Sequence, residues 1–203
     1  GRHLDPLERV AYGAPLGMVV GSLALVPVAT LVGFRAEAIV VVGASCLLVA
    51  AVVRYGSSVL GGSLAQDMRT SMSSLRTRPT AGTSPRERVR RMGLLPAIVI
   101  GAFAIRWAFF WREALTRHVD GLWAGHVNIW GDWTVHLGIV SSFAYGTNFP
   151  PSHPRFDGHA FAYHYLSDLT AAAMVALGMD PAGALALHSY IGCVLVAIGL
   201  YAF

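Results

Sequence analysis

Residues 11–33 read AYGAPLGMVVGSLALVPVATLVG, an uncharged stretch that decides the fold class. As an α-helix, these 23 residues would be roughly 34 Å long, enough to cross the hydrocarbon core of a bilayer. The composition of the whole chain agrees, because 55% of its 203 residues are hydrophobic and only 13% are charged. Such a chain is too apolar for an ordinary water-facing surface. The sequence therefore predicts an all-α integral membrane protein.

Three further segments are expected to span the membrane, at about residues 36–53, 93–111 and 182–203. The first two of the four spans are separated only by a tight turn, which predicts an antiparallel helical hairpin. The chain stops within an apolar run at Phe203, so we expect it to be a piece of a larger polytopic protein. The expected organisation is a hairpin over 1–55, a loop over 56–92 and a third unit over 93–203.

The loop over 56–92 fixes the predicted orientation. It carries seven arginines against two acidic residues, so the positive-inside rule places it in the cytoplasm. All fifteen basic residues of the chain are arginine, which we interpret as a GC-rich, bacterial coding bias. The sequence pI of 9.4 is explained by this topology, and nucleic acid is not an expected partner. The protein is predicted to lie in the cytoplasmic membrane.

Residues 112–180 are consequently expected on the exoplasmic side. The segment 112–133 is too polar to span, and its tryptophans Trp123, Trp130 and Trp133 are predicted to lie on the bilayer surface. The apolar piece 134–145 is too short to cross and indicates a re-entrant or interfacial helix. Residues 159–178 are expected to form a further helix, and Pro181 begins the last span.

Polar side chains concentrate between residues 126 and 168, which hold five of the eight histidines. Asp132 lies between a glycine and a tryptophan at the start of an apolar helix, where an acidic residue is costly without a partner or a function. His136 follows four residues later and would share its helix face. The alternative is that Asp132 only caps the helix, since Asp is a favoured N-cap.

A second group of candidates follows along the chain. The loop 148–159, NFPPSHPRFDGH, is stiffened by three prolines, which suits a site that holds polar groups in place. A solvated surface loop is the alternative. His164 and Asp168 are predicted to form an i, i+4 pair on the next helix, which can orient a catalytic imidazole or satisfy two polar groups at a membrane boundary. The candidates here are His153, Arg155, Asp157, His159, Tyr163, His164 and Asp168.

Several catalytic classes lack their signatures. No HExxH motif occurs, and the spacings of His and Asp match no recognised metal signature. The chain has neither a GxSxG nor a Walker sequence, so serine hydrolases and nucleotide hydrolases have no support. Cys46 and Cys193 both lie within apolar runs and provide neither a disulfide framework nor a CxxC site.

The segments GDWTVHL (131–137) and NFPPSHPRFDGHAFAYHYLSDL (148–169), set between two expected spans, resemble the amino-terminal module of GT-C superfamily glycosyltransferases. The resemblance covers about residues 93–203. It implies transfer of a sugar from a polyprenyl-phosphate donor to an acceptor hydroxyl at the outer face of the membrane. It also implies that Asp132, the acidic residue of the first outer loop, is the catalytic base or organises the acceptor. A DxD pattern is absent, so we expect no metal and no other cofactor.

Physical chemistry is consistent with those roles. An acceptor hydroxyl needs a base held close to it, and Asp132 would take its proton with His136 or His164 as partner. The departing phosphate needs positive charge, for which Arg106, Arg112, Arg117 and Arg155 are candidates. Arg106 is equally explained by snorkelling to the headgroups. Two alternatives stay open: a polytopic transporter whose polar cluster relays protons or binds a solute, and a structural membrane subunit.

Overall fold

The computed structural model describes residues 6–59, 94–125, 130–156, 158–159, 161 and 164–202. The predicted cytoplasmic loop 56–92 lies outside the described residues except for its first four, which end a helix. The candidate residues Asp157 and Tyr163 also lie outside them.

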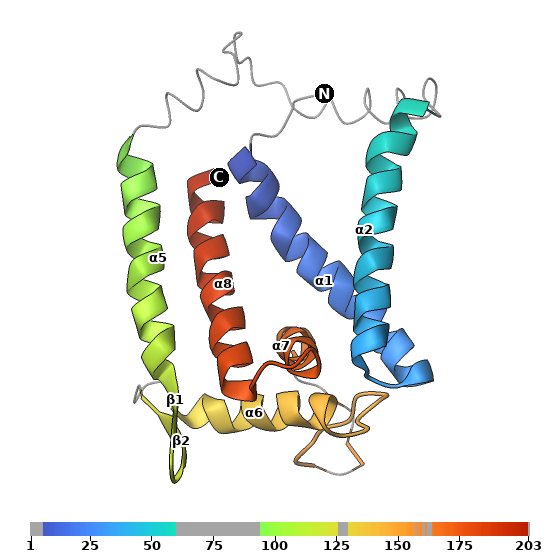
Figure 1. Ribbon diagram of the computed structural model, residues 1–203, viewed down its shortest axis with the longest axis vertical. Helices are drawn as coiled ribbons and strands as arrows, with labels where there is room; N and C mark the ends of the chain where they lie inside the picture. The colour runs from blue at the N-terminus through green and yellow to red at the C-terminus, as the bar shows by residue number, and fades with distance from the viewer. Residues whose placement is uncertain are drawn as a thin grey trace.

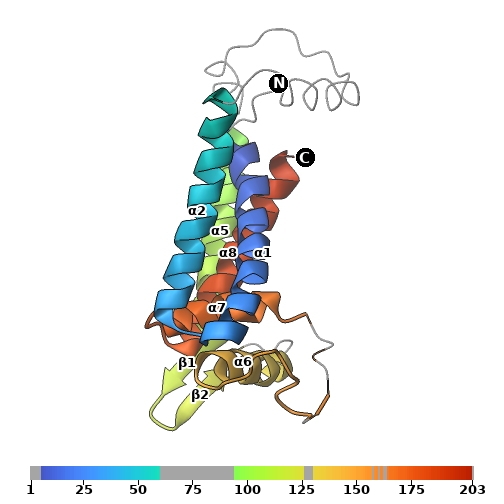
Figure 2. The ribbon, with the colours of Figure 1, turned by 90° about the vertical axis from the view of Figure 1, so that its right-hand side faces the viewer.

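The described residues are mostly helical. In chain order they form α1 (Pro6–Val32), α2 (Ala36–Val59), α5 (Leu94–Ala114), β1 (Leu115–His118), β2 (Gly121–Ala124), α6 (Trp130–Ala144), α7 (Leu166–Ala176) and α8 (Pro181–Ala202). Figure 1 shows α1, α2, α5 and α8 running between the two ends of the molecule, whereas α6 lies across one end with the strands beside it. Figure 2 shows α6, α7 and the strands gathered at this same end, called the α6 end below.

Within the described part of the chain, three helical stretches are long and apolar enough to cross a membrane: Glu8–Val32, Ala36–Val53 and Pro181–Ala202. Large apolar side chains along them face outward, such as Leu31, which is 83% exposed, and Leu200, which is 77% exposed. Such surfaces are unfavourable in water and suit a hydrocarbon layer. The helices therefore indicate a membrane-embedded protein, and their bounds agree closely with the predicted first, second and fourth spans. α5 has 21 residues but carries charges in its second half, so the fourth crossing stays a prediction.

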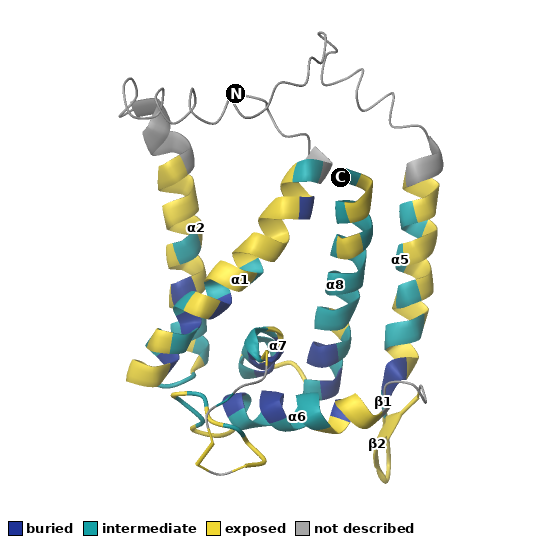
Figure 3. Ribbon diagram, turned by 180° about the vertical axis from the view of Figure 1, so that it is seen from behind, coloured by how far each residue is buried: buried dark blue, intermediate teal, exposed yellow. Residues whose placement is uncertain are grey.

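The core of the fold lies at the α6 end. Figure 3 shows buried positions gathered in α6, in α7 and in the adjoining part of α8, while the far halves of α1, α2 and α5 are largely exposed and that of α8 is mostly intermediate. Phe143, Leu169 and Val140 are the largest fully buried side chains. α8 packs against α5, α1, α7 and α6, so it connects the spans to the crosswise helix.

The segment 112–133 contains an antiparallel β-hairpin that the sequence did not predict, in which Leu115 pairs with Ala124 and His118 with Gly121. One prediction about this segment is wrong. Trp133 does not lie on the surface, because only 6% of it is exposed and its ring packs edge-on against Trp111 at 5.9 Å. Trp133, Val140 and Phe143 share one helical face, and that face is the one that α6 turns toward the core.

The helix predicted over 159–178 is shorter than expected, because α7 begins only at Leu166. The rings of Phe161 and Tyr165 instead pack against Phe143 of α6, at 6.2 and 5.8 Å between centroids. These contacts hold the chain before α7 in an irregular path across the α6 end. A consequence is that His164 precedes the helix, while Asp168 lies within its first turn.

Candidate functional site

A polar contact between residues far apart in sequence joins α6 to α7. Nδ1 of His136 and Oδ1 of Asp168 are 2.8 Å apart, and the two residues are 32 positions apart in sequence. The sequence indicated two pairs within single helices, Asp132 with His136 and His164 with Asp168. The structure pairs His136 with Asp168 across the helix interface, and His164 is exposed before the helix.

The side chain of Asp168 is buried. Only 2% of the residue is exposed, and Oδ2 is buried without a hydrogen-bond partner among the described residues. Burying a carboxylate is costly unless an opposite charge lies beside it. The imidazole of His136 is therefore the group that makes this position tolerable.

The pair changes the protonation of His136, which is half-buried on a helix outside the spans. Its hydrogen bond to Asp168 raises the pKa of His136 above the ordinary 6.5. Burial of the ring opposes this effect, and the negative charges of Asp168 and Asp132 add to it. The site therefore favours the imidazolium form more than a free histidine does, and in that form Nε2 is the second N–H donor.

Asp132 is exposed and lies in the first turn of α6. The helix begins at Trp130, so Asp132 is not the N-cap residue that the simpler alternative required. A carboxylate in this turn interacts favourably with the helix dipole. One turn later comes His136, and an exposed carboxylate and a half-buried imidazole thus lie on neighbouring positions of one helix.

The arginine candidates divide between the two ends of α6. The contact of Trp111 with Trp133 sets the end of α5, which carries Arg112, beside the start of α6, where Asp132 lies. Arg117 follows directly on β1. Arg106 lies two turns back along α5, with its guanidinium carbon 5.9 Å from the ring centre of Phe110. All three side chains are exposed.

The Pro-rich loop lies at the other end of α6. The ring centre of Phe149 lies 5.3 Å from that of Phe34, in the α1–α2 turn, and 5.2 Å from that of Phe143. These two contacts anchor the loop to the helical hairpin of α1 and α2 and to the core. His153 is half-buried, whereas Arg155 and His159 are exposed. The structure thus separates these candidates from Asp132 by most of the length of α6.

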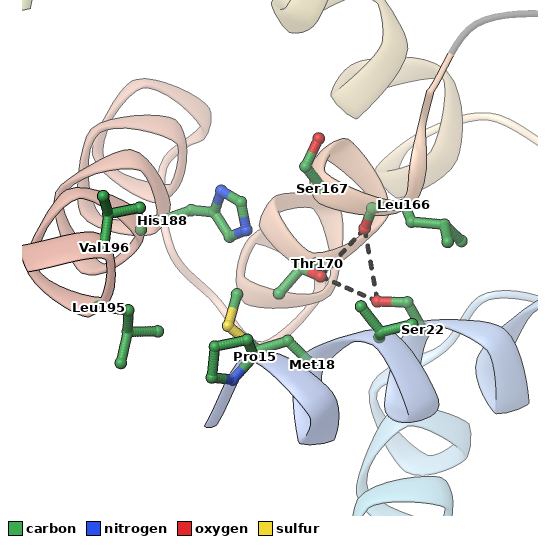
Figure 4. A pocket seen from close by; sticks show the side chains of 11 residues that line it. Pro15, Met18, Ser22, Leu166, Ser167, Thr170, His188, Leu195 and Val196 are labelled. Carbon is green, nitrogen blue, oxygen red and sulfur yellow. Dashed lines mark hydrogen bonds between the residues drawn. The ribbon is translucent and has the colours of Figure 1, made fainter. Parts of the chain in front are cut away.

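A pocket of about 440 Å³ lies between α1, α7 and α8, and neither His136 nor Asp168 lines it. Apolar side chains of α1 and α8 form most of its lining, together with Ser22, Thr170 and His188. Figure 4 shows Ser22 of α1 meeting Thr170 of α7, with their oxygens 2.9 Å apart, and the ring of His188 directed from α8 toward α7.

Sequence reasoning overlooked His188. A histidine within an apolar span is a functional candidate by default, and that signal was available in the sequence. The contact between His136 and Asp168 had no such signal, because a spacing of 32 residues follows no helical period. No group of three or more His, Cys, Asp or Glu that could hold a metal occurs in the described part of the chain.

These features define a class, a helical membrane protein with a polar site at one end of its apolar bundle. Comparisons with protein-family models, with curated proteins and with solved structures found no match to this chain. Its activity must therefore be argued from the site.

Proposed function

We propose that this chain is part of a GT-C-type glycosyltransferase, which moves a sugar from a polyprenyl-phosphate donor to an acceptor hydroxyl at the outer face of the cytoplasmic membrane. The observation that carries the proposal is the arrangement on α6. An exposed carboxylate, Asp132, lies one turn from a half-buried imidazole, His136, which Asp168 holds from α7. This helix crosses the end of an apolar bundle, where a lipid-linked sugar would present its reactive carbon.

The reaction needs one base and one cation. Asp132 accepts the proton of the acceptor hydroxyl as that oxygen bonds to the anomeric carbon. The bond between the anomeric carbon and the phosphate oxygen breaks, and its electron pair leaves with the polyprenyl phosphate. A single displacement of this kind inverts the anomeric centre, since base and leaving group lie on opposite faces of the sugar.

His136 suits the cationic role. Asp168 holds its Nδ1, and the Nε2–H of the imidazolium can donate to a phosphate oxygen as negative charge develops there. The hydrogen bond also fixes the ring, which reduces the reorganisation needed during the reaction. Arg112 and Arg117, near the same end of α6, would add positive charge for the departing phosphate.

The arrangement of the spans supports a lipid-linked donor. The pocket between α1, α7 and α8 is apolar over most of its lining, which includes Ser167, the residue before Asp168 in α7. A hydrocarbon chain in this pocket would lie within the bilayer, while its phosphate reached the α6 end. The proposal requires α5 to be a fourth span and the α6 end to face outward, as the positive-inside rule predicts.

The test uses synthetic polyprenyl-phosphate sugars with the full chain in nanodiscs, and it measures the release of polyprenyl phosphate. Asp132→Asn should lower release by about 10²- to 10⁴-fold, the usual contribution of a general base. Asp132→Glu should retain part of the activity. Glu37→Gln is a matched control, because Glu37 is also an exposed carboxylate in the first turn of a helix at the α6 end. Undiminished release by Asp132→Asn would overturn the assignment.

A transporter is the second candidate, and His188 is the observation that favours it. This histidine extends the polar site from α6 and α7 into a span. It lies only about 10 Å from the start of α8, however, and no acidic or basic residue follows it in that helix. A proton or solute path would need polar groups through the remaining length. Solute uptake by proteoliposomes that His188→Leu abolishes would favour transport over transfer.

A further inference from the structure

A second pocket, of about 490 Å³, lies where the end of α6 meets the Pro-rich loop. Its lining is polar and consists of Ser142, Gly146, Thr147, Asn148, Ser152, His153 and Pro154. The volume is within the range of roughly 300–1,000 Å³ that is usual for small-molecule sites. Among the lining residues there is no Arg, Asp or Glu, so the lining suits a neutral, hydrogen-bonding ligand rather than a charged one.

Asn148 keeps the pocket in shape. Its Nδ2 donates to Ser142 Oγ at 3.1 Å and to the Ser152 carbonyl at 2.9 Å. Its Oδ1 accepts from the Ser152 backbone N–H at 2.9 Å and from the Ser152 hydroxyl at 2.7 Å. Both donors and both lone pairs of the amide are thus in use. Asn148 is a structural clamp, which leaves recognition to its neighbours and makes the pocket largely pre-formed.

Three groups remain to face a ligand. Thr147 presents an exposed hydroxyl, which both donates and accepts. Ser152 Oγ keeps lone pairs for accepting, because its own proton is given to Asn148. His153 Nδ1 accepts from the Arg155 backbone N–H at 3.2 Å, so its proton is on Nε2, which is the donor. Mixed donors and acceptors at short spacing match the vicinal hydroxyls of a sugar.

Two exposed aromatic residues are neighbours of the pocket residues. Tyr145, next to the pocket residue Gly146, is 69% exposed. Phe156 is 62% exposed, and its ring centre lies 4.7 Å from that of His153. Large aromatic rings left in the open beside a polar pocket favour a binding surface, since their burial is favourable once a partner arrives. The apolar C–H face of a pyranose ring is such a partner.

From these observations we infer that the pocket is a carbohydrate subsite, which binds a neutral saccharide against the ring of Phe156 and holds its hydroxyls on Thr147, Ser152 and His153. Resting on the proposed function, the saccharide is the sugar acceptor. The pocket begins at Ser142, ten residues or about 15 Å along α6 from Asp132. The acceptor is therefore an oligosaccharide rather than a single sugar, since it must extend from the pocket along α6 toward Asp132.

Binding is measured without transfer, in the Asp132→Asn full chain in nanodiscs. The probes are methyl glycosides of glucose, mannose and galactose together with maltotriose and α-1,6-mannotriose, followed by saturation-transfer NMR and by tryptophan fluorescence of Phe156→Trp. We expect millimolar binding of at least one probe. Thr147→Val and His153→Phe should each weaken it roughly 3- to 10-fold, because each removes one hydrogen bond and keeps the side-chain shape. Thr30→Val, at an exposed threonine of α1, and His118→Phe, on β1, are the matched controls.

Each outcome has one meaning. Binding of no probe overturns the carbohydrate subsite. Binding by Thr147→Val and His153→Phe that is as tight as binding by the chain without these two substitutions also overturns it. Quenching of the tryptophan introduced by Phe156→Trp with brominated lipids, unchanged by saccharide, also overturns it, because the aromatic rings would then be membrane anchors. Saccharide binding without any release of polyprenyl phosphate by the unmutated chain would sustain the subsite while the proposed function failed. Where transfer occurs, the pocket variants should raise KM for the acceptor and leave kcat unchanged.

Discussion

His136 and Asp168 form an ion pair between two helices, with Nδ1 and Oδ1 2.8 Å apart. The partners are unequal, since the side chain of His136 is 26% exposed and that of Asp168 only 3%. The pair ties the crosswise helix α6 to α7, and α7 in turn packs on the spans α1 and α8. The pair therefore links the polar α6 end of the molecule to its apolar helices.

The first prediction concerns pH. His136 has a pKa raised above 6.5, chiefly by its hydrogen bond to Asp168. The stabilisation is therefore fully present below pH 6.5 and is lost as the pH rises through the raised pKa. Unfolding of the chain in detergent at a series of pH values should show stability declining through that window. Asp168→Asn should remove most of this decline and lower the pKa of His136, measured by NMR of labelled imidazole. A decline of equal size in Asp168→Asn would contradict the prediction.

The second prediction concerns the unequal burial of His136 and Asp168. His136→Phe leaves a buried carboxyl without its partner and should cost about 3 kcal/mol of unfolding free energy, within the range for broken buried pairs. Asp168→Leu should cost less, about 1 kcal/mol, because a half-exposed imidazole can be solvated instead. The double variant should recover at least about 1 kcal/mol of the summed loss, since apolar replacements of both partners are often neutral. Additive losses would show that the two side chains do not interact.

The sequence predicted the long helices well, for a simple physical reason. A span is a local property, because some twenty apolar residues in succession need no partner to be recognised. Residues 36–53 and 182–203 therefore agree almost to the residue with the apolar helical stretches Ala36–Val53 of α2 and Pro181–Ala202 of α8. The start of α7 could not be predicted in this way. Phe161 and Tyr165 are compatible with a helix, yet both precede α7 and pack against Phe143 of α6, a contact that the sequence does not reveal.

The sequence indicated which residues belong to the candidate site, but not which of them pair with each other. Asp132, His136 and Asp168 were all selected, because ionisable residues among apolar ones attract attention wherever they fall. Spacing then favoured partners four residues apart, which share a helix face. The partner of His136 comes instead from another helix, and such a contact depends on how α6 crosses α7. The polar pocket was likewise beyond the sequence, since it needs the end of α6 and the loop together.

The third prediction tests how the helical hairpin of α1 and α2 is attached to α7. Ser22 is buried in α1, and its hydroxyl lies 2.9 Å from Thr170 of α7. Ser22→Ala and Thr170→Val should each cost about 1 kcal/mol, the usual net value of one hydrogen bond. Thr30→Val is the control, because Thr30 bonds within its own helix, to the Val26 carbonyl. Thermal unfolding followed by tryptophan fluorescence measures the difference. Equal shifts for the control and the two variants would show that the contact adds nothing specific.

The fourth prediction compares two glycines of the α6 region. A Cβ at Gly146 would come 2.5 Å from the Ser142 carbonyl oxygen, a backbone atom that cannot turn away. A Cβ at Gly138, within α6, would meet nothing within 4 Å. Gly138→Ala should therefore stabilise the chain by up to about 1 kcal/mol through helix propensity. Gly146→Ala should destabilise it by about 1–3 kcal/mol, since backbone must shift to admit the methyl group. Thermal unfolding of the two variants beside the unmutated chain measures both effects.

The same pair of variants separates the two ends of α6. Gly146 lines the polar pocket, so its substitution should distort the clamp around Asn148 and weaken saccharide binding by at least as much as Thr147→Val. The pair of His136 and Asp168 lies nearer the start of α6, so the pH dependence of stability that it causes should persist in both variants. Loss of that pH dependence in Gly146→Ala would mean that the loop and the ion pair form one cooperative unit. Undiminished saccharide binding in Gly146→Ala would mean that the pocket does not recognise the sugar.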